Sequence, residues 1–333
     1  MIRVGVVGAS GFMGGELVRL LLGHPHVQLT SVAGGSSAGK RLASIRAGFA
    51  GVSELLIDPA EPDLLAGKCD LVFLALPHGE SAVLAAQLLN RDVKVIDLGS
   101  DFRLKNPADV EQYYGRPAVH TELLDQAFYS LPELTGVIPE RTRLLASPGC
   151  FATGLNLVLA LCDGLVESVD LFGITGSTGS GIAPSAGVHH SLRSTNFVAY
   201  KALNHQHEGE VRQLLSERRA EIDFRFVPHS APLTRGIHLT TVVRAPASEL
   251  KARWETLYGG KPMLIRYDAP VALGSVVGTN LVAMGMVEQG DSTAITCAFD
   301  NLLKGGSGQA IQSMNLWLGF PETAGLPMIA AWP

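Results

Sequence analysis

The chain has 333 residues, a formal net charge of −5, and 47% hydrophobic against 17% charged residues. This composition excludes a disordered chain and a strongly basic nucleic-acid-binding protein. A length above ~250–300 residues predicts about two domains. Because no apolar run reaches the ~18 residues of a membrane span and the chain starts directly with strand-like residues, we expect a cytoplasmic protein. The cysteines lie far apart in sequence, so we expect reduced thiols and neither disulfides nor a zinc site; they are Cys69, Cys150, Cys162 and Cys297.

A strand, a glycine turn and a helix open the chain. Residues 2–7 are apolar, residues 8–15 are rich in glycine, and residues 16–22 favour a helix. In this order, the N–H groups of the turn and the positive end of the helix dipole face a dinucleotide pyrophosphate. The GxxGxxG spacing departs from the commoner GxGxxG, so an ordinary strand-to-helix turn is the alternative. The predicted cofactor-binding residues here are Gly8, Ser10, Gly11, Phe12, Met13 and Gly14.

The residues after the next strand, which is expected at 28–33, predict which dinucleotide is bound. An NAD-binding protein is expected to place a carboxylate near the end of this strand, whereas this chain has Ser36, Ser37 and Lys40. Hydroxyls and a cation favour a 2′-phosphate, so the cofactor prediction is NADP. A solvated basic loop is the alternative.

Buried strands at residues 70–76 and 94–98 alternate with helices, which predicts a doubly wound parallel sheet of the Rossmann type. Ligands of such sheets lie at the carboxyl ends of the strands. We expect residues 105–145, which are rich in proline, tyrosine and polar residues, to be an irregular excursion.

Cys150 follows Pro148-Gly149 and opens an apolar run with helical spacing. It is therefore predicted at a helix N-terminus, where unpaired N–H groups and the helix dipole lower a cysteine pKa from about 8.5 to roughly 3.5–7.5. We interpret Cys150 as a nucleophile; a buried cysteine that packs as a small hydrophobe is the alternative.

Strands dominate after this helix and predict a second, mixed α/β domain. A small-residue loop at 176–181 contains Gly179 and can approach a cofactor closely or simply connect two strands. His205 and His207 can form a metal pair, but no further ligand cluster completes it, so we rank an acid–base role above metal binding and level with a surface position. Arg235 can bind a substrate carboxylate as a fork or form a surface ion pair.

Together these residues resemble the N-acetyl-gamma-glutamyl-phosphate reductase family, a branch of the aspartate-semialdehyde dehydrogenase superfamily. The resemblance spans nearly the whole chain, and Pro-Gly-Cys and Asp-Asn-Leu-x-Lys-Gly are specific in combination. It rests on residues 8–11, 101–104, 148–150, 205–207, 235–237 and 300–305.

The resemblance implies the architecture: a Rossmann dinucleotide-binding domain at 1–149, a mixed α/β catalytic and dimerisation domain at 150–308, and a C-terminal segment at 309–333 whose helix returns to the first domain. It also implies a homodimer or homotetramer formed through the second domain.

The resemblance further implies the residue roles. Cys150 is the nucleophile, His207 the acid–base partner and His205 a supporting substrate-binding residue. Arg103 meets the phosphate, Arg235 meets the substrate carboxylate, and Asn301 lies near the nicotinamide.

The implied reaction is NADPH-dependent reduction of N-acetyl-gamma-glutamyl phosphate to the gamma-semialdehyde and phosphate through a cysteine thioester, in arginine biosynthesis. One alternative keeps this chemistry on an N-succinyl substrate or on a glutamyl or aminoadipyl phosphate linked to an acidic carrier protein. The carrier version predicts a basic rim around the cleft that uses Lys201 or Arg193. A more remote alternative is a non-catalytic NADP-binding regulator, because fold does not fix function.

Overall fold

The computed structural model describes residues 1–331, which separate into two compact units. Unit 1 comprises Met1–Ser130, Val137–Ser147 and Ser307–Leu326. Unit 2 comprises Leu131–Gly136, Pro148–Gly306 and the chain from Pro327. Residues 332–333, the end of the predicted 309–333 segment, lie outside the described residues. None of the helices formed by residues 1–331 is long and apolar enough to cross a membrane.

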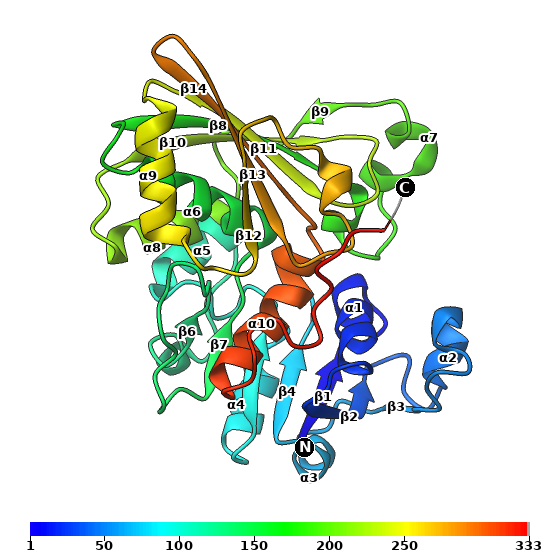
Figure 1. The fold of residues 1–333 in the computed structure, drawn as a ribbon. Helices are drawn as coiled ribbons and strands as arrows, with labels where there is room; N and C mark the ends of the chain where they lie inside the picture. Colours follow the sequence, from blue (N-terminus) through cyan, green and yellow to red (C-terminus); the bar gives the residue numbers. More distant parts are fainter. Residues whose placement is uncertain (332–333) are drawn as a thin grey trace. The chain divides into compact units, whose positions relative to one another are not determined.

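Unit 1 is built on a parallel sheet with the order β3-β2-β1-β4-β5-β7-β6 (Figure 1). Its central strands are buried because helices cover such sheets, as their continuous apolar runs predict. The strands are β1 Ile2–Val7, β2 Val27–Ala33, β3 Ile57–Asp58, β4 Leu71–Leu74, β5 Lys94–Asp97, β6 Phe128–Tyr129 and β7 Leu144–Ala146. The helices are α1 Phe12–Leu21, α2 Leu42–Ile45, α3 Pro62–Lys68, α4 Ala82–Leu89, α5 Pro107–Tyr114 and α10 Gly308–Trp317.

The C-terminal helix α10 belongs to unit 1 and contacts α1. Its buried Ser313 accepts a 2.8 Å hydrogen bond from the Ser130 hydroxyl. The Asn315 side-chain oxygen lies 3.0 Å from Nε2 of buried His24. These buried polar contacts fix the helix against elements more than 180 residues away in sequence.

Residues 105–145 are more regular than the predicted excursion. The Asn106 side chain accepts a 3.0 Å hydrogen bond from the Ala108 N–H and caps α5, whose first residue is proline. Strands β6 and β7 then complete the edge of the sheet. The segment is otherwise irregular, as predicted; β6 and β7 were not predicted because strands of two or three residues carry no periodic signal and are fixed by their neighbours.

Unit 2 contains a mixed sheet with the order β12-β13-β14-β11-β8-β10-β9. Alternate residues of β8 are buried against α6, as expected for a sheet with one covered face. The strands are β8 Ser168–Thr175, β9 Val198–Ala199, β10 Asp223–Ser230, β11 Ile237–Val243, β12 Leu264–Tyr267, β13 Val282–Gln289 and β14 Ser292–Phe299. The helices are α6 Cys150–Cys162, α7 His190–Arg193, α8 His207–Glu217 and α9 Ala247–Tyr258.

The core of unit 2 lies between this sheet and helices α6, α8 and α9 (Figure 1). Helix α6 is buried from Phe151 to Cys162, and Gly154 is required because a Cβ there would lie 2.6 Å from the Phe299 ring. The two sheets confirm the predicted fold class, a Rossmann-type unit and a mixed α/β unit.

The short segment Leu131–Gly136 groups with unit 2 although it lies between two stretches of unit 1. Lys304 donates a 2.7 Å hydrogen bond to Glu133, and both side chains are fully buried. Arg218 donates to the Leu134 carbonyl at 3.0 Å. The buried ion pair and this hydrogen bond hold the segment on unit 2.

Candidate active site

Cys150 is the first residue of α6, and the extended Gly149 precedes it as the N-cap. The thiol is half-buried, whereas Cys69, Cys162 and Cys297 are buried. Burial raises the pKa of Cys162 and of Cys297 to about 12. The helix N-terminus therefore presents the one partly exposed thiol of residues 1–331 in the environment that favours a thiolate.

His207 and Glu210 converge on the peptide group that precedes this cysteine. Both are buried on α8, three residues apart, so they lie on the same face of the helix. The Gly149 N–H donates a 2.8 Å hydrogen bond to Oε2 of Glu210. A Cβ at Gly149 would lie 2.4 Å from Nε2 of His207 and 2.7 Å from Oε1 of Glu210. Only glycine leaves room for this approach, which brings the predicted acid–base residue next to the predicted nucleophile.

His205 supports His207 from the preceding turn. Nδ1 of His205 accepts a 3.2 Å hydrogen bond from the His207 backbone N–H, and the two ring centroids lie 4.6 Å apart. Phe151 packs edge-on against the His205 ring. Burial, with Lys201 as a further cause, lowers the pKa of His205 to about 4. His205 is therefore a neutral imidazole near neutral pH.

A π-helical turn at Leu303–Ser307 packs against Cys150. A Cβ at Gly305 would lie 2.9 Å from Cβ of Cys150. The neighbouring Lys304 forms the buried ion pair with Glu133. Such π-turns are frequent at functional sites because they displace the backbone locally.

Asn301 and Arg235 lie together at the loop after β8. The Asn301 side-chain oxygen accepts a 2.6 Å hydrogen bond from the Gly236 N–H, and its amide donates to Thr178 at 3.1 Å. Nε of Arg235 donates to the fully buried Asp300 at 2.6 Å. Asn301 thus joins the Arg235-Gly236 segment to the small-residue loop that contains Gly179.

Unit 1 carries the other predicted residues, beginning with the glycine turn after β1. Gly8 has a φ of 89°, and a Cβ there would lie 2.3 Å from the Ala75 carbonyl oxygen. A Cβ at Gly14 would lie 2.2 Å from the Gly8 oxygen, so both positions require glycine for close strand–helix packing. Helix α1 starts at Phe12 without a capping side chain. Its first N–H groups fit a dinucleotide pyrophosphate.

Other predicted cofactor-binding residues lie in this turn and in the loop after β2. Ser10 accepts a 2.8 Å hydrogen bond from Arg46, whose guanidinium lies 5.9 Å from the Phe12 ring centroid. The Met13 carbonyl accepts from Ser307 at 2.8 Å. Ser36 and Lys40 are exposed and Ser37 is half-buried in the loop after β2. Sequence analysis missed Arg46, which has no motif around it.

Arg103 lies at the carboxyl end of β5 in unit 1. It is buried and donates to the Leu98 carbonyl at 2.8 Å. The neighbouring Asp101 accepts from the N–H groups of Gly79 and Ser81. Burial raises the pKa of Asp97, in the same cluster, to about 6, and Asp101 adds to the rise.

Unit 2 therefore brings together Cys150, His205 and His207 at the start of α6. The same unit holds Arg235, Asn301 and Gly179 at the loop after β8. Unit 1 holds the glycine turn, the serine loop after β2 and Arg103. Glu210 was not predicted from the sequence; its i+3 spacing from His207 places it on the same face only once α8 is known to be a helix.

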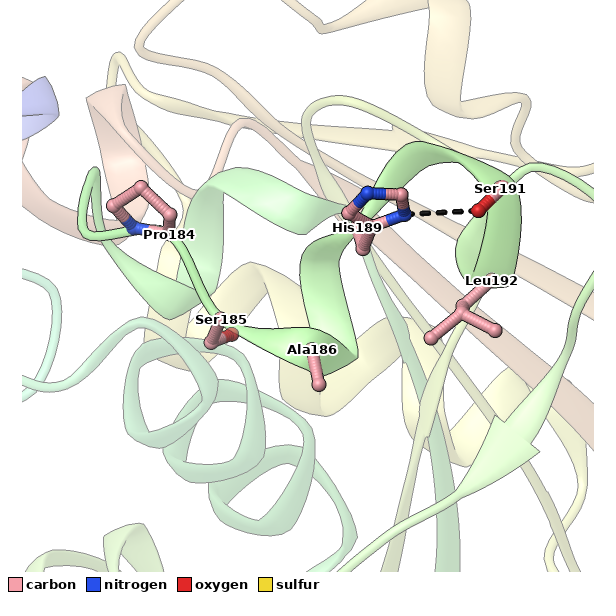
Figure 2. Close-up of a pocket in the computed structure, with 6 residues that line it drawn as sticks. All are labelled: Pro184, Ser185, Ala186, His189, Ser191 and Leu192. Atoms are coloured by element: carbon pink, nitrogen blue, oxygen red, sulfur yellow. Dashed lines mark hydrogen bonds between the residues drawn. The ribbon is translucent and has the colours of Figure 1, made fainter.

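A surface hollow of about 570 Å³ lies on α7 and the segment before it (Figure 2). His189 and Ser191 form a 2.9 Å hydrogen bond there. The predicted catalytic residues do not line this hollow. It is lined by Pro184, Ser185, Ala186, His189, Ser191 and Leu192.

The two units match two family models in sequence. Residues 3–136 match the NAD binding domain of semialdehyde dehydrogenase, and residues 150–301 match the semialdehyde dehydrogenase dimerisation domain. Aspartate semialdehyde dehydrogenase II of Vibrio cholerae has the same fold, with a TM-score of 0.70 at 16% identity over 96% of this chain and 98% of that chain. The Candida albicans enzyme, solved with NADP, gives a TM-score of 0.66 at 15% identity over 96% and 98%. Fold and site thus define a semialdehyde dehydrogenase with a nicotinamide dinucleotide domain.

Full-length relatives specify the branch. N-acetyl-gamma-glutamyl-phosphate reductase of Alkalilimnicola ehrlichii is 38% identical over 100% of both chains. The protein of that name from Methanopyrus kandleri is 38% identical over 98% of both chains. The chain belongs to the N-acetyl-gamma-glutamyl-phosphate reductase family. The resemblance found in the sequence is confirmed.

Proposed function

We propose that this protein catalyses the NADPH-dependent reduction of N-acetyl-gamma-glutamyl phosphate to N-acetylglutamate gamma-semialdehyde and phosphate, a step of arginine biosynthesis in the cytoplasm. The observation that carries the proposal is the convergence of His207 and Glu210 on Gly149, directly before Cys150. It supplies a nucleophile, a proton carrier and a carboxylate in one place. The names of the full-length relatives support the substrate.

In the first step, the Cys150 thiolate attacks the acyl phosphate carbonyl. The carbon–oxygen bond to phosphate breaks, inorganic phosphate leaves, and a thioester with Cys150 remains. The role proposed for Arg103 is to bind the leaving phosphate, because a guanidinium matches phosphate oxygens. The buried position of this residue at a strand end of unit 1 supports that role.

In the second step, the thioester carbonyl is reduced to a thiohemiacetal. The dinucleotide supplies the hydride when bound, and the glycine turn, the serine loop after β2, Gly179 and Asn301 are the residues proposed to hold it. His207 supplies the proton that the reduced carbonyl oxygen takes up, recovers it from the thiohemiacetal hydroxyl as the carbon–sulfur bond breaks, and gives it to the departing thiolate. Neutral His205 fixes the backbone of His207 and contacts the substrate.

Phosphate-dependent reduction of NADP by N-acetylglutamate semialdehyde tests the function, with NAD and the N-succinyl compound in parallel. We expect turnover with the N-acetyl compound and NADP, and none in Cys150→Ser. Turnover of the succinyl compound alone would change the substrate. Activity only with a carrier-linked semialdehyde would identify an acidic carrier protein as the partner.

We further propose that two copies associate through the sheet face of unit 2 that faces away from α6. Phe172, Val242 and Val287 are 51%, 64% and 39% exposed. They lie close together because Phe172 pairs with Thr240 in β11, while Val242 and Val287 both pair with Ala294. An exposed apolar patch on a domain matched as a dimerisation domain supports a symmetric dimer. Sedimentation of Val242→Lys against the wild-type protein tests this.

A further inference from the structure

The Nε side of the Arg235 guanidinium is paired with a carboxylate within the protein. Asp300, which accepts from its Nε at 2.6 Å, is fully buried and also accepts from the N–H groups of Gly278 and Leu302. The resulting ion pair joins β11 to the end of β14 and serves the fold. The substrate carboxylate, which the family resemblance assigns to Arg235, would share a guanidinium that already faces a carboxylate.

Arg193, the last residue of α7, is bonded differently. Its guanidinium donates to the Ser230 hydroxyl, to the Ala231 carbonyl at 2.7 Å and to the Thr175 carbonyl at 3.3 Å. All three acceptors are neutral, and they lie where the parallel strands β8 and β10 end. Among the described residues no carboxylate lies within ion-pair distance of Arg193. Half-burial lowers its pKa.

This arrangement leaves donors for an external anion. An arginine has five N–H donors in a planar fork, and these bonds use only part of them. Nε of Arg193 is buried and has no acceptor within residues 1–331. A desolvated cation with an unused donor is costly unless an anionic group approaches it.

Tyr200 places this cation near the reacting thiol. Its ring packs edge-on against His205, with centroids 5.9 Å apart, and its N–H donates to the Pro228 carbonyl at 3.0 Å. Tyr200 and Cys150 both pack against the core of unit 2. Burial raises the pKa of Tyr200; the Cys150 charge also raises it, and the Arg193 charge opposes the rise. Tyr200 therefore lies within electrostatic reach of both groups.

The turn after Tyr200 is held in a strained conformation. Lys201 and Leu203 have φ angles of 45° and 58°, in the left-handed region that non-glycine residues rarely adopt. The Leu203 N–H donates to the Phe226 carbonyl at 3.0 Å, which fixes the turn on β10. Such strain persists where surrounding structure requires it and is common at active sites. Here it orients Tyr200 and the histidine pair on one short segment.

We propose that Arg193 binds the carboxylate of the acyl-phosphate substrate, with Tyr200 packed between this carboxylate and the carbon attacked by Cys150. The inference rests on the proposed function and identifies the residue that makes a free carboxylate a requirement of the substrate. Arg235 then has a structural role, through its ion pair with Asp300.

The test compares kcat/KM for N-acetylglutamate semialdehyde with that for its α-carboxamide, in the phosphate-dependent direction. A charge-assisted hydrogen bond predicts that the wild-type protein prefers the carboxylate by about 10- to 100-fold. In Arg193→Gln we expect this preference to fall to near 1, mainly through KM for the semialdehyde. Arg193→Lys keeps the charge without the fork and should retain part of the preference.

The matched control is Arg225→Gln, because Arg225 pairs with Asp170 on the exposed face of the same strands. Arg225→Gln should keep the wild-type preference for the carboxylate over the carboxamide. In Arg193→Gln, KM for phosphate and KM for NADP should be unchanged. An unchanged preference in Arg193→Gln would overturn the proposal. A rise in KM for phosphate alone would also overturn it, since Arg193 would then serve the leaving group.

A second measurement needs no turnover: protection of Cys150 from iodoacetamide by N-acetylglutamine and by N-acetylglutamine amide. The wild-type protein should be protected at about 10- to 100-fold lower concentration by the carboxylate, and Arg193→Gln should show no difference. If the N-acetyl substrate fails to turn over but this difference holds, the proposed function fails and the carboxylate site stands. Equal protection of the wild-type protein by both compounds would contradict the site.

Discussion

The Gly149 N–H donates a 2.8 Å hydrogen bond to the carboxylate of Glu210, which joins the start of the cysteine helix α6 to the first turn of α8. Gly149 directly precedes Cys150, and Glu210 follows His207 by three residues. The bond between Gly149 and Glu210 therefore sets the distance between Cys150 and His207. A buried backbone contact therefore orients the proposed catalytic pair.

Removal of that contact is expected to lower turnover. Glu210→Ala leaves the buried Gly149 N–H without its acceptor, at a cost of about 1–3 kcal/mol. If that energy is lost from transition-state positioning, kcat falls about 5- to 100-fold. Glu210→Gln keeps an acceptor oxygen and should unfold in urea like the wild-type protein. The exposed Glu217→Gln on the same helix is the control; an equal loss of kcat there would contradict the assignment.

Selective alkylation should identify the nucleophile. Cys69, Cys162 and Cys297 are buried, and burial raises the pKa of each thiol. We expect iodoacetamide to label the native protein once, at Cys150, with parallel loss of activity. Peptide mass spectrometry locates the label. Substantial labelling of a second cysteine before unfolding, or activity that survives complete labelling of Cys150, would refute this expectation.

The buried pair Lys304–Glu133 should be costly to break and inexpensive to replace. Lys304→Met leaves the Glu133 carboxylate buried without its cation and should destabilise the protein by about 3–5 kcal/mol. The double variant Lys304→Met with Glu133→Met removes both charges and should recover most of that loss. Urea unfolding measures both free energies. A double variant less stable than Lys304→Met would show that the pair itself is strongly favourable.

His205 should make stability fall in acid. Burial lowers its folded pKa to about 4, below the ordinary value of 6.5. Between these values the unfolded chain binds a proton that the folded chain does not, so the free energy of unfolding rises with pH. The contribution is complete above about pH 6.5 and is lost as pH falls through 4. His205→Gln should have a shallower dependence between pH 4 and 6.5 in urea titrations; identical slopes would contradict it.

The sequence determined the parts of this protein that depend on local order. The strand, glycine turn and helix at residues 2–22 form in the predicted order, but the helix starts at Phe12 instead of residue 16. Gly8 in the turn and Gly14 in the first turn of the helix have no room for a side chain. Pro148-Gly149 separates β7 from α6, which starts at Cys150 as this Pro-Gly pair predicts. The helix that the resemblance implies within residues 309–333 corresponds to α10, Gly308–Trp317. The family was also recognisable from motif residues in sequence alone.

Tertiary structure decided the parts that join distant segments. The six residues Leu131–Gly136 group with unit 2 through contacts to positions such as Lys304, 171 residues from Glu133. The sequence does not show that a buried carboxylate meets Arg235 and that only neutral acceptors meet Arg193. The local sequence determines backbone preference and hydrophobic periodicity. The partner of a charged side chain depends instead on which strands end side by side, and only the folded chain fixes that.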